Sequence, residues 1–216
     1  MNSLLHGQEI AVKILSSIII SKRVAHAYLF KGPKGCGMEE SAREFSKALL
    51  CIGNDGENIT GSSLVETADV FALSCGVCES CQAFSNNNHP DLFYFEKEGT
   101  SIKIKTSHEM LKESLTRPYL SKRKVFVINE AENMTLEAAN ALLKLLEEPP
   151  SYVTFILTTS SELMIPSTIV SRCQVIPFRP LPASVIADIL EREHGVPRKD
   201  SQEIAMFSSG SIERAL

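Results

Sequence analysis

Apolar residues occur along the chain in two patterns that alternate. Continuous apolar runs predict buried strands at Ala27–Phe30, Asp91–Phe95, Lys124–Glu130, Val153–Thr158 and Gln174–Phe178. Apolar residues spaced three and four apart predict one or two helices within Leu4–Ile20, then helices over Glu39–Leu50, Lys103–Leu115, Leu136–Glu148 with Thr135 as its N-cap, Ala183–His194 and Ser201–Ser208, and a helical turn at Pro166–Ser171. Strands that alternate with helices predict an α/β fold with a parallel sheet.

Proline, glycine and polar residues divide these elements into parts. Gly53–Ser63 is rich in Gly, Asn and other polar residues and predicts a loop. Pro177, Pro180 and Pro182 indicate a linker near residue 179. We therefore expect an α/β domain over residues 1–178 and a small helical domain over residues 179–216. The helical pattern is unfinished at Leu216, as in a fragment of a longer chain.

The composition is that of an ordinary globular protein. Of the 216 residues, 44% are hydrophobic and 22% are charged, which is enough to bury a core. The net charge of −4 gives no overall attraction to nucleic acid. No apolar run approaches the roughly 18 residues of a membrane span, and the first residues lack the basic region and cleavage site of a signal peptide. We expect a cytoplasmic protein without membrane contact.

A glycine loop lies between the first predicted strand and the next helix. This order is typical of a phosphate-binding loop, Gly-x-x-x-x-Gly-Lys-Ser/Thr, in which backbone N–H groups hold phosphate, the Lys reaches the outer phosphates and the hydroxyl holds Mg²⁺. Gly32, Gly35 and Gly37 supply the glycines, but Met38 stands at the Lys position and Glu39 at the Ser/Thr position. A simple strand-to-helix turn is the alternative; we favour a phosphate-binding loop without its chemistry.

The predicted strand that begins at Lys124 ends in Asn129-Glu130. A nucleotide hydrolase of this type carries an Asp for Mg²⁺ there, followed by a Glu that orients the attacking water. The amide of Asn129 replaces that Asp. Because the phosphate cation, the Mg²⁺ hydroxyl and the Mg²⁺ carboxylate are all missing, we expect no functional site for ATP and Mg²⁺. The remaining possibility is that Lys31 or Lys34 takes the place of the missing Lys.

Four cysteines are candidate metal ligands, namely Cys51, Cys75, Cys78 and Cys81. Three of them fall within seven residues, and four thiolates close the tetrahedral shell of a structural Zn²⁺. Buried reduced cysteines are the alternative, and His89 competes for the fourth position. We predict a zinc module at about residues 51–90.

Two basic features carry further candidate chemistry. Ser171-Arg172-Cys173 lies between a loop and a strand, and the planar guanidinium of Arg172 suits a γ-phosphate. In a chain that does not hydrolyse ATP, that arginine could serve only a neighbouring subunit; a solvated surface arginine is the simpler interpretation. The run Ser121–Lys124 is interpreted as the solvated start of a strand, with a nucleic-acid contact as the alternative.

Several of these segments together resemble a known family. In chain order they are His26–Phe30 with its glycine loop, the cysteine cluster, Lys124–Glu132, Asn140–Pro150, Phe155–Thr159 and Ser171–Cys173. From about Gly7 to Leu216 the chain resembles bacterial clamp-loader subunits of DNA polymerase III, the gamma/tau and delta-prime group of AAA+ proteins. The resemblance implies an AAA+ α/β domain of the phosphate-loop type with an embedded zinc module, followed by a helical lid, and it implies a C-terminal collar domain that this chain does not include.

The departures from the family pattern indicate one branch. Gamma/tau subunits hydrolyse ATP, whereas the chain departs from them at Met38, Glu39 and Asn129 and so resembles the non-hydrolysing delta-prime branch. The resemblance implies that Arg172 is an arginine finger for the ATP of an adjacent subunit and that the four cysteines bind zinc. It also implies that Thr158-Thr159 is an idle sensor, and Glu213 stands where the family has a second-sensor Arg.

The function implied is that of a stator in a pentameric loader. Its partners would be gamma/tau and delta subunits, with the sliding clamp and primed DNA, in a nucleotidyltransferase complex that carries out replication. Two alternatives are an active gamma/tau-type ATPase and a zinc-dependent nucleic-acid-binding module on an inactive AAA+ scaffold. Binding of ATP with Mg²⁺ would favour the former, and DNA affinity lost on chelation would favour the latter.

Overall fold

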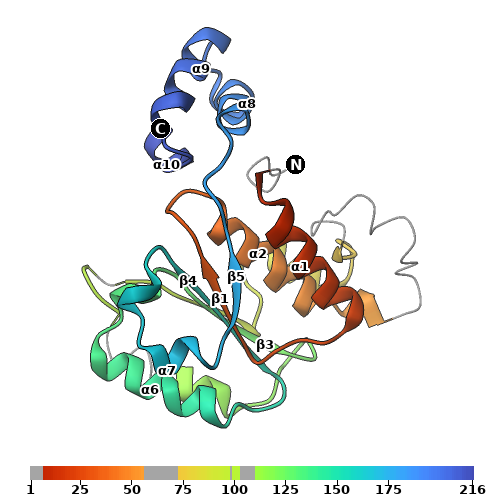
Figure 1. The fold of residues 1–216 in the computed structure, drawn as a ribbon. Helices are drawn as coiled ribbons and strands as arrows, with labels where there is room; N and C mark the ends of the chain where they lie inside the picture. Colours follow the sequence, from red (N-terminus) through yellow and green to blue (C-terminus); the bar gives the residue numbers. More distant parts are fainter. Residues whose placement is uncertain (1–6, 56–72, 98, 103–109) are drawn as a thin grey trace.

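The computed structural model describes residues 7–55, 73–97, 99–102 and 110–216. Five strands form one parallel sheet in the order β2-β3-β4-β1-β5 (Figure 1). They are β1 Ala27–Lys31, β2 Leu92–Phe95, β3 Lys124–Ile128, β4 Val153–Thr159 and β5 Gln174–Pro177. All strands run the same way, so the loops that follow β1, β3 and β4 open at one edge of the sheet, where ligand sites of α/β folds form.

Helices cover both faces of the sheet. α1 (Glu9–Ser21) and α2 (Met38–Leu50) lie on one face, and α6 (Leu136–Glu147) and α7 (Ser167–Val170) lie on the other (Figure 1). Central strands are therefore buried on both sides, which explains why β3 and β4 are buried along their whole length instead of alternating between buried and exposed residues. The fold is thus the three-layered α/β arrangement that the alternating pattern predicts.

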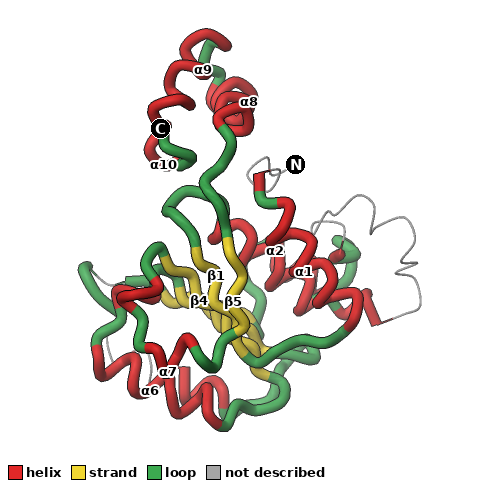
Figure 2. The backbone as a smooth tube through the Cα atoms, viewed as in Figure 1, coloured by secondary structure: helices red, strands yellow, loops and turns green. Residues whose placement is uncertain are grey.

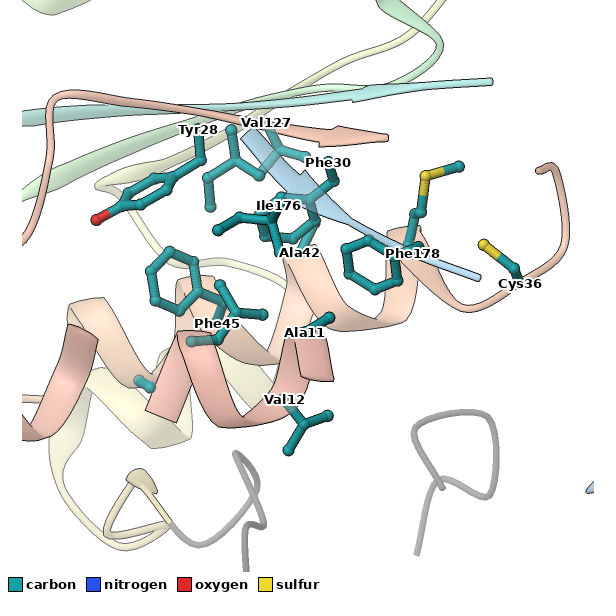
Figure 3. Packing of buried hydrophobic residues seen from close by; sticks show 14 of the residues in the cluster. Ala11, Val12, Tyr28, Phe30, Cys36, Ala42, Phe45, Val127, Ile176 and Phe178 are labelled. Carbon is teal, nitrogen blue, oxygen red and sulfur yellow. The ribbon is translucent and has the colours of Figure 1, made fainter. Parts of the chain in front are cut away.

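Aromatic side chains fill the layer between β1 and the helices that cover this face of the sheet. Figure 3 shows Phe45 of α2 beneath Tyr28 of β1, and their ring centroids lie 5.2 Å apart with the planes at 89°. Phe30 packs against Phe178, with centroids 5.2 Å apart. Because each of these rings is almost completely buried, this layer fixes α2 on the sheet and with it the loop that leads into α2.

The remaining elements are short or lie beyond the sheet. They are the 3₁₀ helices η2 Ile52–Asp55, η4 Ala131–Asn133 and η5 Glu162–Met164, and the α-helices α4 Glu79–Ser85, α8 Ala183–His194, α9 Arg198–Phe207 and α10 Ile212–Ala215. α8, α9 and α10 form a group beyond the end of β5, apart from the helices that cover the sheet (Figure 2). Within the described part of the chain, no helix is long and apolar enough to cross a membrane.

Most predicted elements are confirmed, with shifts at their ends. Thr135 caps α6, its Oγ1 accepting the Ala138 N–H at 3.2 Å. α9 begins at Arg198, earlier than predicted, directly after Pro197, which occupies the N-cap position with an extended backbone. α10 and α4 were not predicted, since neither is long enough to show a period. The predicted loop over 53–63 and helix over 103–115 fall largely outside the described residues; residues 110–114 are helical.

Two interpretations of the sequence are wrong. The segment Asp91–Phe95 was expected to be a buried strand, but β2 is an edge strand and 40% of Tyr94 is exposed. Lys124 was expected to be solvated, but it is buried: its ammonium donates to the Glu113 carbonyl at 3.0 Å and lies 5.3 Å from the ring centroid of Phe93. A lysine whose charge is satisfied by a backbone oxygen, by the Glu113 carboxylate at 3.7 Å and by an aromatic face can be buried at the start of a strand.

Candidate functional site

The glycine loop joins β1 to α2 and forms one wall of a cleft of about 300 Å³. Gly35 and Gly37 have φ angles of 68° and 95°, which only glycine adopts without strain, so the tight turn needs both. The Gly32 N–H donates to the Thr159 carbonyl at 3.1 Å and holds the loop against the end of β4. Met38 opens α2 and lines the cleft, at the position where a phosphate-binding loop has its lysine.

Carboxylates dominate the lining of this cleft. They belong to Glu39, Glu40, Glu130, Glu132 and Glu213, and Lys34 is the only basic residue among the described lining residues. Partial desolvation, followed by the negative charges of Glu40 and other carboxylates, raises the pKa of Glu39 above its usual range. The N-terminus of α2 attracts anions in principle, but here it faces a concentration of negative charge.

Lys34 does not lie free to receive a phosphate. It forms an ion pair with Glu130, whose other carboxylate oxygen pairs with Lys97 at 2.7 Å. Hydrogen bonds from these two ammonium groups lower the pKa of Glu130. Lys31, the second candidate for a replacement lysine, pairs with Glu162.

The end of β3 is buried behind this ion pair. Asn129 is 9% exposed; its amide nitrogen donates to Glu96 at 3.3 Å, and its Oδ1 has no hydrogen-bond partner among the described residues. Glu130 adopts a left-handed backbone, φ 50°, and its N–H donates to Thr158 Oγ1 at 3.0 Å. Thr158 is therefore engaged by the neighbouring strand end.

The last helices close the cleft from the far side. The Ile212 N–H donates to the Gly35 carbonyl at 2.9 Å, and a Cβ added to Gly35 would lie 2.5 Å from Ser211 Oγ and 2.8 Å from the Glu213 nitrogen. Glu213 thus faces the loop and lines the cleft. The backbone of α10 and the glycine loop are in direct contact.

The four candidate zinc ligands come together in space. The sulfur atoms of Cys51, Cys75, Cys78 and Cys81 all lie within 4.8 Å of one another. Cys51 Sγ is 3.9 Å from Cys78 Sγ, and Cys75 Sγ is 4.0 Å from Cys81 Sγ. Four sulfurs bound tetrahedrally at about 2.3 Å from Zn²⁺ lie about 3.8 Å apart, so the cluster has the dimensions of a structural zinc site.

Backbone N–H groups point at these sulfurs as they do in thiolate sites. The N–H groups of Cys75, Cys78 and Cys81 donate to sulfurs of the cluster at 3.3, 3.4 and 3.4 Å. Burial works against ionisation of Cys78, yet the backbone N–H groups of Cys81 and Gly53 lower the pKa of that thiol to about 6. The donor set fits a metal that prefers thiolate, which could be held by the four sulfurs.

His89 is not a member of this cluster. Its Nδ1 accepts the Asp91 N–H at 3.1 Å, so its Nε2–H faces the hydroxyls of Ser80 at 2.9 Å and Ser121 at 3.2 Å. Both hydroxyls donate to the carbonyl of Leu50, at 2.6 and 2.7 Å. Leu50 and Ser80 each precede a cysteine of the cluster, so this buried network ties the cluster to the sheet and removes His89 as a competing ligand.

Arg172 lies at the end of α7, away from the glycine loop. Its Nη2 pairs with Glu147 Oε1 at 2.9 Å and its Nη1 donates to the Thr168 carbonyl at 2.9 Å, while 35% of the side chain is exposed. Ser171 donates to the same carbonyl, at 3.1 Å. Burial raises the pKa of Cys173 to about 12, so this thiol serves in packing. The arginine is therefore the accessible charged group of the triplet.

A comparison with protein families decides what these features belong to. Residues 7–182 match the family described as "DNA polymerase III, delta subunit", which covers the sheet, the glycine loop, the cysteine cluster and Arg172. The chain belongs to the clamp-loader family of DNA polymerase III. This confirms the resemblance that the sequence motifs carry.

Curated clamp-loader proteins of both branches are similar to the chain. It is 36% identical to the DNA polymerase III subunit delta' of Bacillus subtilis over 83% of the chain and 50% of that protein. It is 33% identical to the tau/gamma subunit of Haemophilus influenzae over 97% of the chain and 29% of that protein. The chain thus spans half or less of the length of these relatives.

Solved structures support the fold of this clamp-loader family member. A gamma-subunit-related protein from Thermotoga maritima superposes with a TM-score of 0.56 at 20% identity, over 91% of this chain and 58% of that one. The Holliday junction branch migration motor RuvB from Thermotoga maritima gives a TM-score of 0.59 at 16% identity, over 97% and 59%. At such identities the likeness concerns the fold alone.

Sequence reasoning missed three residues that shape these sites. A Cβ on Gly53 would lie 2.5 Å from Cys75 Sγ, so this glycine makes room for the cluster; its place two residues after Cys51 was the available signal. Gln8 is buried and forms hydrogen bonds with the Cys36 carbonyl at 2.9 Å and with both backbone groups of Arg179. No sequence pattern predicts these contacts. Ser80 was not identified because a serine between two cysteines is typical of a loop.

Proposed function

We propose that the chain is a clamp-loader subunit of the delta-prime type, which does not hydrolyse ATP. The observation that carries this proposal is the electrostatic character of the cleft at the glycine loop. Met38 offers no charge to phosphate, Glu39 places a carboxylate where Mg²⁺ needs a hydroxyl, and Lys34 is held by Glu130. A triphosphate would meet five carboxylates at close range, and like charges at such distances repel strongly in a partly desolvated cleft.

Binding of ATP to the purified chain tests this proposal. We expect no saturable, Mg²⁺-dependent binding at millimolar ATP in titration calorimetry, with a gamma/tau subunit as the positive control. Micromolar, Mg²⁺-dependent binding would favour the alternative of an active ATPase. The observed pairing of Lys31 and Lys34 with glutamates argues against that alternative.

The second part of the proposal assigns Arg172 as an arginine finger in trans. The arginine would leave Glu147 and bind the γ-phosphate of ATP on an adjacent gamma/tau subunit. Exposed ion pairs such as Arg172–Glu147 contribute about 0–1 kcal/mol, so exchanging the carboxylate for a phosphate costs little. Ser171 and Cys173 position the arginine by closing and packing the end of α7.

A reconstituted loader tests the role of Arg172. We expect Arg172→Ala to lower DNA-stimulated ATP hydrolysis and clamp loading by a factor of about 10³ or more if the arginine acts directly on the transferred phosphate. Glu147→Gln is the matched control: it removes the intramolecular partner, keeps the arginine, and should leave hydrolysis at the wild-type rate or above. Unchanged hydrolysis with Arg172→Ala, in a loader that still assembles, contradicts the assignment.

The third part concerns the metal and the assembly. The cysteine cluster would bind one structural Zn²⁺ in a module at about residues 51–90 of an AAA+ domain over residues 1–178, followed by a lid over 179–216. The partners would be gamma/tau and delta subunits, with the sliding clamp and primed DNA in the assembled complex. Metal content of the purified chain tests the zinc, and DNA affinity that disappears on chelation would favour the zinc-dependent nucleic-acid-binding alternative.

A further inference from the structure

A second cleft lies at the opposite edge of the sheet from the glycine loop. It has a volume of about 330 Å³ and is formed by the ends of α1 and α2 and by the residues that precede β3 and β4. Because all strands are parallel, the segments before β3 and β4 lie at the amino edge of the sheet, whereas the glycine loop follows the carboxyl end of β1. The two clefts are therefore separate sites, and neither ATP nor Arg172 accounts for this one.

The lining combines positive charge with an aliphatic floor. Its basic residues are Lys22, Lys122 and Arg123, and no acidic residue is among the described residues that line it. Its floor is made of Ile19, Val24, Ala48, Leu49, Leu50 and Ile52, several of them in the main hydrophobic core. The net charge of the chain is −4, whereas the charged side chains around this apolar hollow are three cations. The local charge is therefore opposite in sign to that of the whole chain.

Arg123 is the least ordinary of these cations. It is only partly exposed, and no carboxylate among the described residues forms an ion pair with it. The titratable group that interacts with it is the phenol of Tyr28, which is neutral at pH 7 and whose oxygen already accepts the Ala25 N–H at 2.7 Å. A half-buried guanidinium carries five donors and costs desolvation energy unless an anion satisfies them.

The chemistry of the lining selects among anionic partners. Nucleic acid is bound through rows of phosphate contacts and through bases stacked on exposed aromatic rings. The floor here is aliphatic, and the aromatic residue of the lining, Tyr152, is partly buried against the core and held there by its hydroxyl, which donates to the Ser114 carbonyl at 3.1 Å. An aliphatic hollow with cations at its rim matches a peptide in which carboxylates adjoin leucine-sized side chains.

We propose that this cleft is a docking site for an acidic, leucine-containing peptide segment of a partner protein. A carboxylate of the peptide binds Arg123 and Lys22, and an aliphatic side chain fills the hollow between Ile19 and Leu49. Cys51 lies in the wall of the cleft, directly before Ile52. The cysteine cluster therefore holds one wall of the docking site in place, which gives the module a role beyond stability.

Fluorescence anisotropy with labelled peptides tests the proposal on the metal-loaded chain. The probes are short glycine-flanked peptides that contain two Glu and two Leu in every order, and the same peptides with Gln for Glu. We expect at least one Glu-containing peptide to bind saturably, with an affinity about tenfold or more above that of its Gln counterpart. Failure of all the Glu-containing peptides to bind overturns the proposal.

Variants then place the binding in this cleft. Arg123→Gln, and separately Lys22→Asn, should each weaken binding by about tenfold, while Lys199→Gln, an exposed cation of α9, should leave it unchanged. Asparagine tolerates the left-handed backbone of residue 22, φ 55°, so that variant keeps the fold even where Arg123→Gln does not. Equal affinity of both cleft variants and wild type, or displacement of the peptide by oligothymidylate at equal concentration, contradicts the proposal.

Discussion

At the scale of single residues, Glu39 shows how one side chain sets the character of the cleft. It lies in the first turn of α2, where the helix dipole favours a carboxylate. Desolvation and the surrounding carboxylates have the opposite effect and raise its pKa. The folded state therefore binds more protons than the unfolded state just above pH 4.5, and the free energy of unfolding falls as the pH rises through that range.

Removing this charge should stabilise the protein at neutral pH. We expect Glu39→Gln to raise the free energy of unfolding at pH 7.5 by a few tenths of a kcal/mol, because the residue is exposed enough for solvent to screen most of the repulsion. At pH 4 the gain should disappear, since Glu39 is then protonated in the native protein. Urea denaturation measures both, with the exposed Glu203→Gln as the control; a less stable Glu39→Gln at pH 7.5 would be inconsistent with this account.

Gly53 offers a second test at this scale. An alanine Cβ at this position would lie 2.5 Å from Cys75 Sγ and 3.1 Å from its Cβ, so a ligand must move. We expect Gly53→Ala to reduce bound zinc and to alter the charge-transfer spectrum of the Co²⁺-substituted protein, because thiolate sites tolerate little change in geometry. Cys173→Ser, which removes a cysteine outside the cluster, should change neither; a wild-type spectrum for Gly53→Ala would refute the packing argument.

The role of a residue could be predicted from the sequence only where its spacing from other residues defines that role. Met38 and Glu39 were recognised because the glycines fix the positions that a lysine and a hydroxyl would occupy. The Lys34–Glu130 pair was not predictable, since it depends on the left-handed backbone of Glu130 and on the order of strands that brings the end of β3 close to the loop.

At the scale of elements, the buried network around His89 couples the cysteine cluster to the sheet. Burial lowers the pKa of His89 below 6.5, so the folded protein keeps this imidazole neutral while the unfolded chain takes up a proton. The free energy of unfolding should therefore fall as the pH drops below 6.5, by up to about 1.4 kcal/mol per pH unit from this group. Protonation of Nδ1 would also leave the Asp91 N–H facing another donor.

The variant His89→Gln isolates this contribution. Glutamine keeps a donor for Ser80 but takes up no proton, so the loss of stability between pH 7.5 and pH 5.5 should be smaller than in the wild type. Urea denaturation of zinc-saturated protein measures the difference, and His194→Gln, on the exposed end of α8, provides the matched control. Parallel pH profiles for His89→Gln and wild type would rule out His89 as the titrating group.

The elements themselves were largely predictable, and the errors have a common physical origin. Each strand and each long helix has a continuous run or a period that its own residues display. The edge position of β2 and the burial of Lys124 depend instead on which segments lie beside them. The residues of a single strand do not determine its neighbours. α10 is too short for a period and is held by contacts with the glycine loop.

At the scale of the whole molecule, the helices α8–α10 are joined to the sheet by few but specific bonds. Gln8 donates to Cys36 O in the glycine loop, and its carboxamide bonds both the N–H and the carbonyl of Arg179 in the linker. On the other side of the linker, the Leu181 N–H donates to Gly210 O at 2.9 Å, and Gly210 has no room for a Cβ beside Pro180. One buried side chain therefore fixes the linker to the loop.

Truncating Gln8 should loosen the helical group without unfolding the sheet. Gln8→Ala leaves the buried carbonyl of Cys36 unpaired, at a cost of about 1–3 kcal/mol, and removes both partly buried bonds to Arg179. This cost is relieved when the linker moves into solvent. We expect faster hydrogen exchange of the Leu181 and Ile212 amides, whose bonds depend on the position of the helical group, and unchanged exchange of the β3 and β4 amides. Gln202→Ala, an exposed glutamine of α9, provides the control. A uniform increase across the sheet would mean that Gln8 stabilises the whole fold, and no increase at Leu181 or Ile212 would mean that the contacts at Gly35 and Gly210 alone hold the helices in place.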